Sequence, residues 1–316
     1  SRAAIGEAAR YAAERKQFGH PIATFGAIRH KLGEMTARTY AMESLIYRTA
    51  GLIDAALAET THDGAAVAQA FEEYAVEASI AKVGGTEVLD YVLDENIQIH
   101  GGNGFVKDYP AERHYRDARV NRIFEGTNEI NRLLIPGMVI RRALKGDLPL
   151  ISAAKKLQDE LLTPSAQPMF SDDAVLAQEG VTVSAFKSVV LIVLGTAMQT
   201  FGQTLNDEQE VLGYAADIMI DAYAAESAVL RARAAATAAH PRADLHVAAA
   251  RTFVNDAAQR VEHAARSALA AMAEGDTRRT LLAALRRVLK IAPINTVALR
   301  RRLADASVER ERYVFE

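Results

Sequence analysis

The sequence contains no cysteine among its 316 residues. This absence excludes disulfide bonds, thiolate metal sites and cysteine nucleophiles, and it fits a reducing compartment. Proline is also scarce, with 8 residues, and aromatic residues make up only 6% of the chain. Proline breaks helices, whereas the frequent alanine loses no side-chain entropy in one. The composition therefore favours helix over sheet.

Neither sign of charge dominates, because 37 basic and 40 acidic residues leave a formal net charge of −3. This balance gives no global reason to expect nucleic-acid binding. Long hydrophobic runs are also lacking, since the most apolar window, Val189 to Leu194, is too short to span a bilayer. The histidines are scattered without metal-ligand spacing, so we expect no metal site.

The chain begins with Ser1-Arg2 and passes directly into a helical pattern, without an initiator methionine, a signal peptide or a transit peptide. We interpret this start as an interior point of a longer protein. The content of alanine and arginine favours a bacterial source of high genomic GC content, which would place the protein in the cytoplasm.

Apolar residues recur at the helical period along most of the chain, and no run alternates with a period of two. We therefore predict an all-α protein with essentially no sheet. Helices are expected over 1–15, 25–53, 65–93, 112–119, 128–144, 183–204, 207–238, 243–274 and 277–290. Gly84 and Gly85 lie inside the third of these and should permit close backbone approach.

Several segments interrupt this pattern. The polar stretch 60–64 should be a turn, 98–109 an irregular functional loop, and 162–173 an exposed linker. Gly146 to Pro149 ends the first group of helices, so we predict two helical domains, at 1–149 and 150–316.

A carboxylate, Glu125, lies between a bulky aromatic residue and a glycine, directly before an expected helix. Thr127 and Asn128 could cap that helix or present donors to an anion at its positive end. Taken alone, the segment is better explained as an acidic helix cap than as a catalytic site.

Three motifs together carry more information. Glu14-Arg15-Lys16-Gln17-Phe18-Gly19 follows the first helix, and Gln98-Ile99-His100-Gly101-Gly102-Asn103-Gly104-Phe105 follows the third. Arg122-Ile123-Phe124-Glu125-Gly126-Thr127-Asn128-Glu129-Ile130 comes about twenty residues later. This order and spacing resemble the C-terminal helical domain of the acyl-CoA dehydrogenases, over Ser1 to about Pro149.

The resemblance extends to one branch of that family. Thr24-Phe25-Gly26 and the later helices look most like the very-long-chain enzymes and their bacterial fatty-acid-degradation relatives. Shorter-chain members commonly have Gln where this sequence has Gly26. Their flavin contacts are therefore not all expected in this chain. Residues from about 151 onward resemble the additional C-terminal helical domain of the very-long-chain type.

The resemblance implies α,β-dehydrogenation of a long-chain acyl-CoA to the trans-2-enoyl-CoA in fatty acid β-oxidation. Glu125 matches the family's catalytic base, which removes the pro-R α-proton, while the β-hydrogen leaves as hydride to N5 of the flavin. An acyl chain would desolvate Glu125 and strengthen it as a base. The backbone of Glu125 would help to polarise the thioester carbonyl. Phe124 and Gly126 match positions that line the acyl-CoA site.

The resemblance also implies FAD contacts shared between the subunits of a homodimer. Arg15 matches the residue that neutralises the FAD pyrophosphate, and Gln17 and Phe18 belong to that contact. The remaining motif residues match positions that contact the cofactor in the family: Gln98, Ile99, His100, Gly101, Gly102, Thr127 and Glu129. Many relatives have Gln in place of Glu129.

Simpler interpretations remain open at two of these positions. Arg15 could form a surface salt bridge with Glu14 or another acid. His100 could be a packing or hydrogen-bonding residue, because loop histidines take these roles more often than the role of a base. The glycines of 101–104 are not a dinucleotide-binding fingerprint, because no strand precedes them.

The segment from Arg278 to Arg302 has eight basic residues and no acidic one. An amphipathic helix here could lie on an anionic membrane surface, although a core-packed helix with a solvated basic side is the simpler interpretation. Dimer contacts could also explain it. The apolar stripe comprises Leu281, Leu282, Leu285, Val288 and Leu289.

The family's amino-terminal and middle domains have no counterpart in this sequence, so we expect the chain alone to be inactive or poorly active. The expected electron acceptor of the whole enzyme is an electron-transfer flavoprotein. Two other classes stay open: a related assembly or interaction protein without turnover, and a nucleic-acid-associated relative supported only by the basic segment.

Overall fold

The structure is a computed structural model that describes residues 1–59, 64–162 and 174–316. Its architecture confirms the predicted all-α class. Within these ranges the only sheet is a hairpin of two short strands, β1 (Lys16–Gln17) and β2 (His20–Pro21). Apart from their end residues, the turn expected at 60–64 and the linker expected at 162–173 lie outside the described residues.

Helices and short 3-10 turns make up the remainder. The first half contains α1 (Arg2–Glu14), η1 (Ile22–Thr24), α2 (Gly26–Ala58), α3 (Gly64–Glu73), α4 (Ala75–His100), η2 (Gly101–Phe105), α5 (Ala111–Ala118), η3 (Arg119–Arg122) and α6 (Asn128–Lys145). The second half contains α7 (Leu150–Leu162), α8 (Ala177–Phe201), η4 (Gly202–Asp207), α9 (Gln209–Thr237), α10 (Ala243–Met272), α11 (Gly275–Val288) and α12 (Thr296–Arg310).

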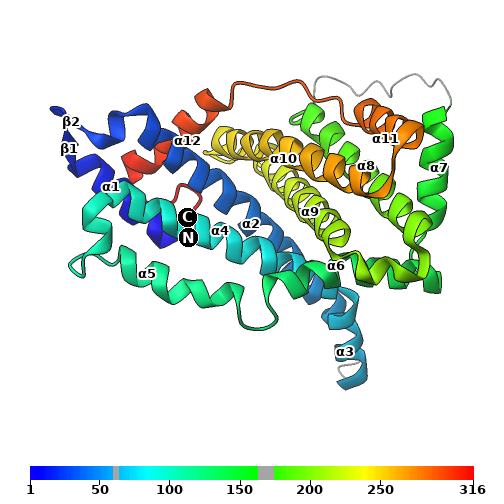
Figure 1. Cartoon of the computed structure of the whole chain (residues 1–316). Coiled ribbons are helices and arrows are strands. Elements are labelled where there is room, and N and C mark those ends of the chain that lie inside the picture. Colours follow the sequence, from blue (N-terminus) through cyan, green and yellow to red (C-terminus); the bar gives the residue numbers. More distant parts are fainter. Residues whose placement is uncertain (60–63, 163–173) are drawn as a thin grey trace.

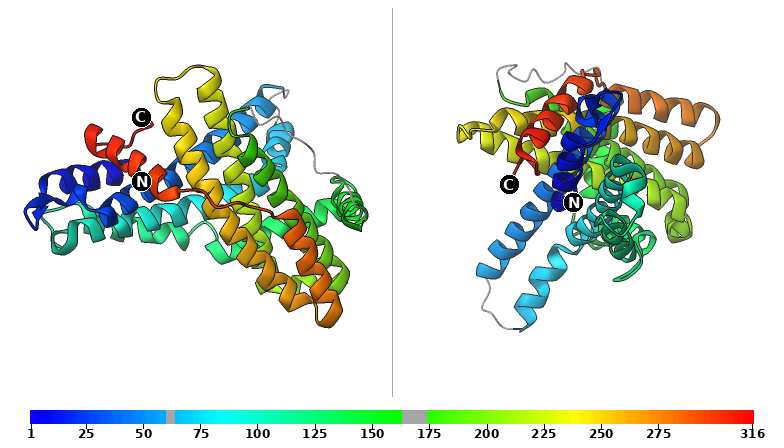
Figure 2. Two further views of the ribbon diagram at one scale, coloured as in Figure 1. Left: turned by 90° about the horizontal axis from the view of Figure 1, so that it is seen from above. Right: turned by 90° about the vertical axis from the view of Figure 1, so that its left-hand side faces the viewer.

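The long helices α2 and α4 run alongside each other, from the end of the molecule that carries α1 to α3 (Figure 1). The β-hairpin, α1 and α12 lie at one end, and α7 and α11 lie at the other (Figure 2). The two chain termini lie close together, because the segment after α12 returns to α1. Arg10 of α1 donates to the carbonyl oxygen of Glu311 at 3.2 Å.

The hydrophobic core crosses the predicted division of the chain. One cluster of buried residues includes Tyr40 and Leu45 of α2 together with Phe186 of α8 and many alanines of α9 and α10. Small side chains let α9 and α10 pack closely along their lengths. The boundary between two domains at 149/150 therefore remains a prediction. In the structure, residues from both sides of this boundary form one hydrophobic cluster.

A backbone approach joins α2 to α12 at Gly33. A Cβ atom at this position would lie 2.3 Å from the carbonyl oxygen of Arg300, so only glycine fits there. Arg300 is buried and donates to Glu34 at 2.6 Å, and it also pairs with Asp256 of α10. These contacts fix α12 against both α2 and α10.

The paired glycines of α4 differ from each other. A Cβ atom at Gly84 would lie 2.8 Å from the sulfur of Met42, whereas one at Gly85 would meet only Ile46, at 3.9 Å. A side chain of α2 therefore packs closely on Gly84, and no comparable contact forms at Gly85.

Several expected boundaries were wrong. The helix expected over 65–93 is divided near Tyr74 into α3 and α4, and α4 continues to His100. It ends there because Gly101 adopts a positive φ of 58°. Two helices, α7 and α12, were not expected from the sequence.

The apolar window around Val189 belongs to a longer helix than expected. Among the described residues, one segment, Ala177–Asp207, is long and apolar enough to cross a membrane, with a mean hydropathy of 1.9. The window from Val189 to Leu194, which is too short by itself to span a bilayer, is therefore only part of a longer apolar segment. In the structure α8 packs against α7, α9 and α10 and buries Phe186, Val189 and Val193, as a core helix does.

The basic segment from Arg278 to Arg302 divides into α11, a connection and the start of α12. Leu285 of α11 is buried, and the other residues of its predicted stripe pack against the main core: Leu281, Leu282, Val288 and Leu289. The apolar face of α11 is thus used for packing, as the simpler interpretation predicted, and arginines occupy its exposed side.

Candidate active site

The predicted base lies on an exposed loop between η3 and α6. Glu125 has a φ of 55° and Gly126 a φ of 76°, so two successive residues are left-handed. A non-glycine residue in this conformation costs about 1–2 kcal/mol, which the surrounding contacts must offset. A side chain at Gly126 would meet a second obstacle, because its Cβ atom would lie 2.9 Å from Nδ2 of Asn131.

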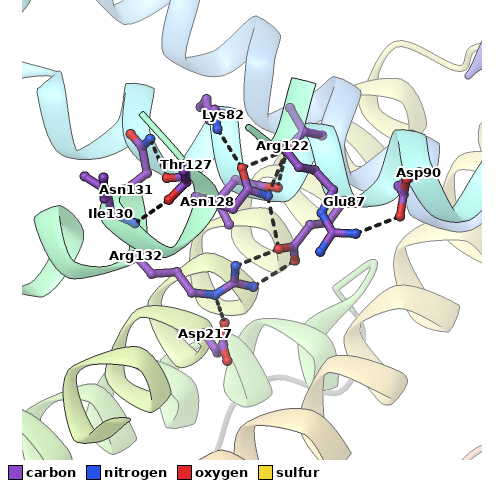
Figure 3. Close-up of polar contacts among 12 residues, drawn as sticks. Lys82, Glu87, Asp90, Arg122, Thr127, Asn128, Ile130, Asn131, Arg132 and Asp217 are labelled. Carbon is purple, nitrogen blue, oxygen red and sulfur yellow. Dashed lines mark hydrogen bonds and ion pairs between the residues drawn. The ribbon is translucent and has the colours of Figure 1, made fainter. Parts of the chain in front are cut away.

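Two side chains hold this loop through its carbonyl groups (Figure 3). Nδ2 of Asn131 donates to the carbonyl oxygens of Gly126 at 2.9 Å and Thr127 at 3.1 Å. Nζ of Lys82, on α4, donates to the carbonyl oxygen of Gly126 at 2.6 Å and to Oδ1 of Asn128 at 2.7 Å. Burial lowers the pKa of Lys82 below its usual value, and nearby Glu129 partly opposes this effect.

The start of α6 combines a helix cap with a buried amide. The hydroxyl of Thr127 accepts from the backbone N–H of Ile130 at 3.3 Å, which confirms it as the helix N-cap. Asn128 is not a cap but is fully buried and donates to Thr86 at 3.0 Å and to Glu87 at 3.1 Å. The loop is thereby fastened to the middle of α4.

Glu129 is exposed in the first turn of α6. A hydrogen bond from its own backbone N–H, followed by one from the Thr127 hydroxyl, lowers the pKa of its carboxyl group. A carboxylate at a helix N-terminus is also favoured by the helix dipole.

A group of ion pairs supports the loop from behind (Figure 3). The guanidinium of Arg132 binds Glu87 through contacts of 2.6 and 2.8 Å and reaches Asp217 of α9 at 2.8 Å. Burial alone would raise the pKa of Glu87, but hydrogen bonds and charge from Arg132 outweigh it and hold this pKa below its usual range. Arg122, before the loop, pairs with Asp90 of α4 at 2.9 Å. Both ends of the loop are therefore tied to α4.

The first motif forms the β-hairpin. Phe18 and Gly19 have φ values of 51° and 82°, the conformation of a two-residue turn with both positions left-handed. The Phe18 side chain is 89% exposed. Arg15 is exposed, and no acid of the described residues forms a salt bridge with it, so the predicted alternative of a pair with Glu14 is absent there. Gln17 is exposed on the same hairpin.

The second motif covers the end of α4 and η2. Gln98, Gly101 and Gly102 are exposed, whereas the side chains of Ile99 and His100 are buried. Nδ1 of His100 lies 2.8 Å from the carbonyl oxygen of Asn96, and its ring stacks on Tyr11 of α1 at 4.2 Å. His100 is thus a packing and hydrogen-bonding residue, as expected.

The three motifs form two separate groups in one chain. The hairpin and the 98–102 segment lie at the same end, because Tyr11 of α1 contacts both His100 and Asn103. The Glu125 loop contacts α4 at Lys82, eighteen residues before His100 and therefore about 27 Å away along the helix. Glu125 and Phe124 are exposed beside that second position.

Two sizeable cavities lie elsewhere. One of about 640 Å³ has charged residues in its wall, including Arg38, Glu87 and Arg260, and one of about 740 Å³ lies between α7, α8 and α11. Neither is lined by Glu125. The chain presents the predicted base on an open surface, which other protein groups would have to cover to exclude water.

Lys82, Asn131 and Arg132 were missed by the sequence interpretation. A usable signal was present in α4, where Lys82, Thr86 and Asp90 recur every four residues and therefore share one helix face. Such a polar stripe indicates a polar partner, which here is the segment that carries Glu125.

The chain is similar to known proteins over nearly its whole length. Two family profiles, each described as "Acyl-CoA dehydrogenase, C-terminal domain", match residues 1–139 and 185–287. A "Probable acyl-CoA dehydrogenase" of Bacillus subtilis is 44% identical over 318 residues, covering 99% of this chain and 53% of the relative. The rat mitochondrial "Very long-chain specific acyl-CoA dehydrogenase" is 40% identical over 134 residues, 42% of this chain and 18% of the relative.

A solved structure shows the same fold. The crystal structure of an acyl-CoA dehydrogenase complexed with FAD, from Bacillus anthracis, superposes with a TM-score of 0.95 at 44% identity. The match covers 99% of this chain and 54% of the other. The chain therefore spans about half the length of these Bacillus proteins.

Proposed function

Because the chain belongs to the acyl-CoA dehydrogenase family, we propose that it forms the C-terminal part of a flavoenzyme that oxidises acyl-CoA thioesters to trans-2-enoyl-CoA thioesters. The observation that carries this proposal is the exposed carboxylate of Glu125 on a backbone fixed by buried and half-buried partners. A base needs such a fixed position, because misplacement of a reacting group by about 1 Å can cost 100-fold in rate.

The residues of the first two motifs fit FAD. An exposed guanidinium without an acidic partner among the described residues, Arg15, suits a pyrophosphate. Gly101 and Gly102 are exposed, and a Cβ atom at either would meet nothing within 4 Å, so a ligand can approach the backbone there. The exposed ring of Phe18 on the hairpin offers a further apolar contact.

The proposed reaction divides between cofactor and protein. FAD would supply the acceptor for the β-hydrogen, which leaves the substrate as hydride. Glu125 would remove the α-proton, while the N–H groups of its loop face a polarised thioester carbonyl. Phe124, exposed beside Glu125, would cover the acyl chain and expel water. Gly126, which has no side chain, would let the loop backbone approach the thioester.

The separation of the two motif groups supports a shared flavin site. The two groups contact α4 at His100 and at Lys82, which lie about 27 Å apart along the helix. One chain would therefore contact two different flavins through these groups, or two distant parts of one flavin. We propose a homodimer in which each flavin contacts both subunits, with an electron-transfer flavoprotein as acceptor. The long-chain preference of the rat relative is our proposal for the substrate class.

An anaerobic visible spectrum of the holoenzyme, before and after addition of palmitoyl-CoA, tests this function. We expect the flavin absorbance to bleach, and to bleach equally in the Glu309→Gln control, which alters an exposed carboxylate of α12. Glu125→Gln keeps the side-chain shape but cannot accept a proton, so its flavin should stay oxidised. A flavin band that ignores acyl-CoA in the unsubstituted holoenzyme would instead favour an assembly role.

A further inference from the structure

The polar stripe of α4 begins with Lys82, which contacts the predicted catalytic loop. We propose that Lys82 is a positioning residue, whose ammonium group fixes the Gly126 carbonyl and so holds the left-handed backbone that aims the Glu125 carboxylate. This inference rests on the proposed function, because it concerns the base of that reaction.

The contacts of Lys82 are specific to the loop and to its adjoining helix. Its Nζ donates at 2.6 Å to the Gly126 carbonyl oxygen and at 2.7 Å to Oδ1 of Asn128, the fully buried amide at the start of α6. One ammonium group therefore links the exposed loop to the buried amide at the start of α6. A hydrogen bond from a charged donor is stronger than one between neutral groups.

The loop needs such a tether because glycine alone does not fix its conformation. Gly126 can occupy both signs of φ with little difference in energy, while Glu125 at a φ of 55° is in an unfavourable region. Rotation about the backbone angles of Gly126 would move Glu125 and its carboxylate away from their position. The Gly126 carbonyl accepts from both Lys82 and Asn131, at 2.6 and 2.9 Å, and these donors oppose that rotation.

The decisive variant is Lys82→Met, which keeps much of the side-chain volume and removes the ammonium group. In the holoenzyme made from the complete coding sequence, we expect flavin reduction by palmitoyl-CoA to slow by about 10- to 100-fold. The Kd for acyl-CoA should change little, because the proposal assigns Lys82 to the loop and not to the substrate. Lys187→Met is the matched control, since Lys187 also binds an acceptor on a neighbouring helix, Glu226, but lies away from the loop.

Rescue distinguishes positioning from general stabilisation. The 316-residue chain has no cysteine, so Lys82→Cys introduces the first thiol in this part of the protein. Treatment with 2-bromoethylamine converts that thiol into a lysine analogue of nearly the same length. We expect this treatment to restore most of the reduction rate of Lys82→Cys and to leave the unsubstituted holoenzyme unchanged.

A crystal structure of the Lys82→Met holoenzyme gives a readout that does not depend on turnover. The proposal predicts that Glu125 leaves the left-handed region or that its carboxylate shifts or becomes disordered. An unchanged loop, or a reduction rate within about twofold of the control, would overturn it. If the unsubstituted holoenzyme fails to bleach with acyl-CoA, the proposed function fails, whereas the loop conformation still decides the role of Lys82.

Discussion

The guanidinium group of Arg132 holds the Glu87 carboxylate through two contacts, of 2.6 and 2.8 Å, and so joins α6 to α4 behind the Glu125 loop. This arrangement suits arginine, whose planar fork matches both carboxylate oxygens, and it is not available to lysine. The site thus consists of an exposed carboxylate in front and a set of charged anchors behind it.

Arg132→Lys should therefore lower the free energy of unfolding by about 1–3 kcal/mol, because Glu87 and Asp217 lose directional partners. Denaturant titration measures this change. Arg266→Lys provides the comparison, since Arg266 forms only an exposed pair with Glu262 one helical turn away, worth about 0.5 kcal/mol or less. Equal losses in both variants would contradict a structural role for the Arg132 fork.

Gly33→Ala should destabilise the protein by about 1–3 kcal/mol or more, because its Cβ atom would overlap the Arg300 backbone. Gly51 lies in the same helix, and a Cβ atom there meets nothing within 4 Å. Gly51→Ala should instead stabilise the protein by up to about 1 kcal/mol, through the better helix propensity of alanine. Thermal unfolding of both variants checks the close packing of α2 on α12. Melting temperatures that shift in opposite directions would support this packing, and shifts in the same direction would contradict it.

Gly126→Ala should slow flavin reduction by about 10-fold or more, because alanine is strained at a φ of 76° and its Cβ atom would lie 2.9 Å from Asn131. The melting temperature should change little, although the rate of flavin reduction falls. Gly137→Ala on α6 serves as the control, since a Cβ atom there meets nothing within 4 Å. A Gly126→Ala holoenzyme that turns over normally would show that the loop tolerates another conformation.

Stability should depend on pH through His246. Burial, followed by the charge of Arg231, lowers the pKa of this histidine to about 4, and its Nδ1 lies 3.0 Å from the Tyr40 hydroxyl. Between pH 6.5 and pH 4 the unfolded chain would bind a proton that the folded chain excludes, so the free energy of unfolding falls as the pH falls. Above about pH 6.5 this contribution should be constant.

The difference in the free energy of unfolding between pH 7 and pH 4.5 measures this effect. It should shrink in His246→Gln and persist in His263→Gln, which alters an exposed histidine of α10. An undiminished difference in His246→Gln would assign the acid sensitivity to other groups, such as Glu87, whose lowered pKa makes its stabilising ion pair fail in acid.

Helical periodicity predicted the all-α class and most helices, because long amphipathic segments such as α10 carry a strong local signal. It missed α12, whose buried positions include Arg300 and Ser307 rather than a clear apolar stripe. Burial of Arg300 depends on Glu34 and Asp256, which are distant in the sequence. Such a helix cannot be recognised from local hydrophobicity.

The candidate site shows a similar limit. The motif order predicted Glu125 and its neighbours, but their positive φ angles and the Lys82 contact depend on tertiary structure. The predicted contacts at Ile99 and His100 illustrate the difference, because these side chains point into the core although their neighbours Gln98 and Gly101 are exposed. Sequence identifies the chemical groups, whereas packing decides which of them face a ligand.

The most direct test of Glu125 as the base is the rate of flavin reduction with palmitoyl-CoA that carries hydrogen or deuterium at the α-carbon. If Glu125 is the base, the unsubstituted holoenzyme should react more slowly with the deuterated substrate, because Glu125 breaks that bond in the reductive step. The Glu125→Gln holoenzyme should show no reduction with either substrate. Reduction of the Glu125→Gln flavin at the unsubstituted rate would show that another group removes the proton.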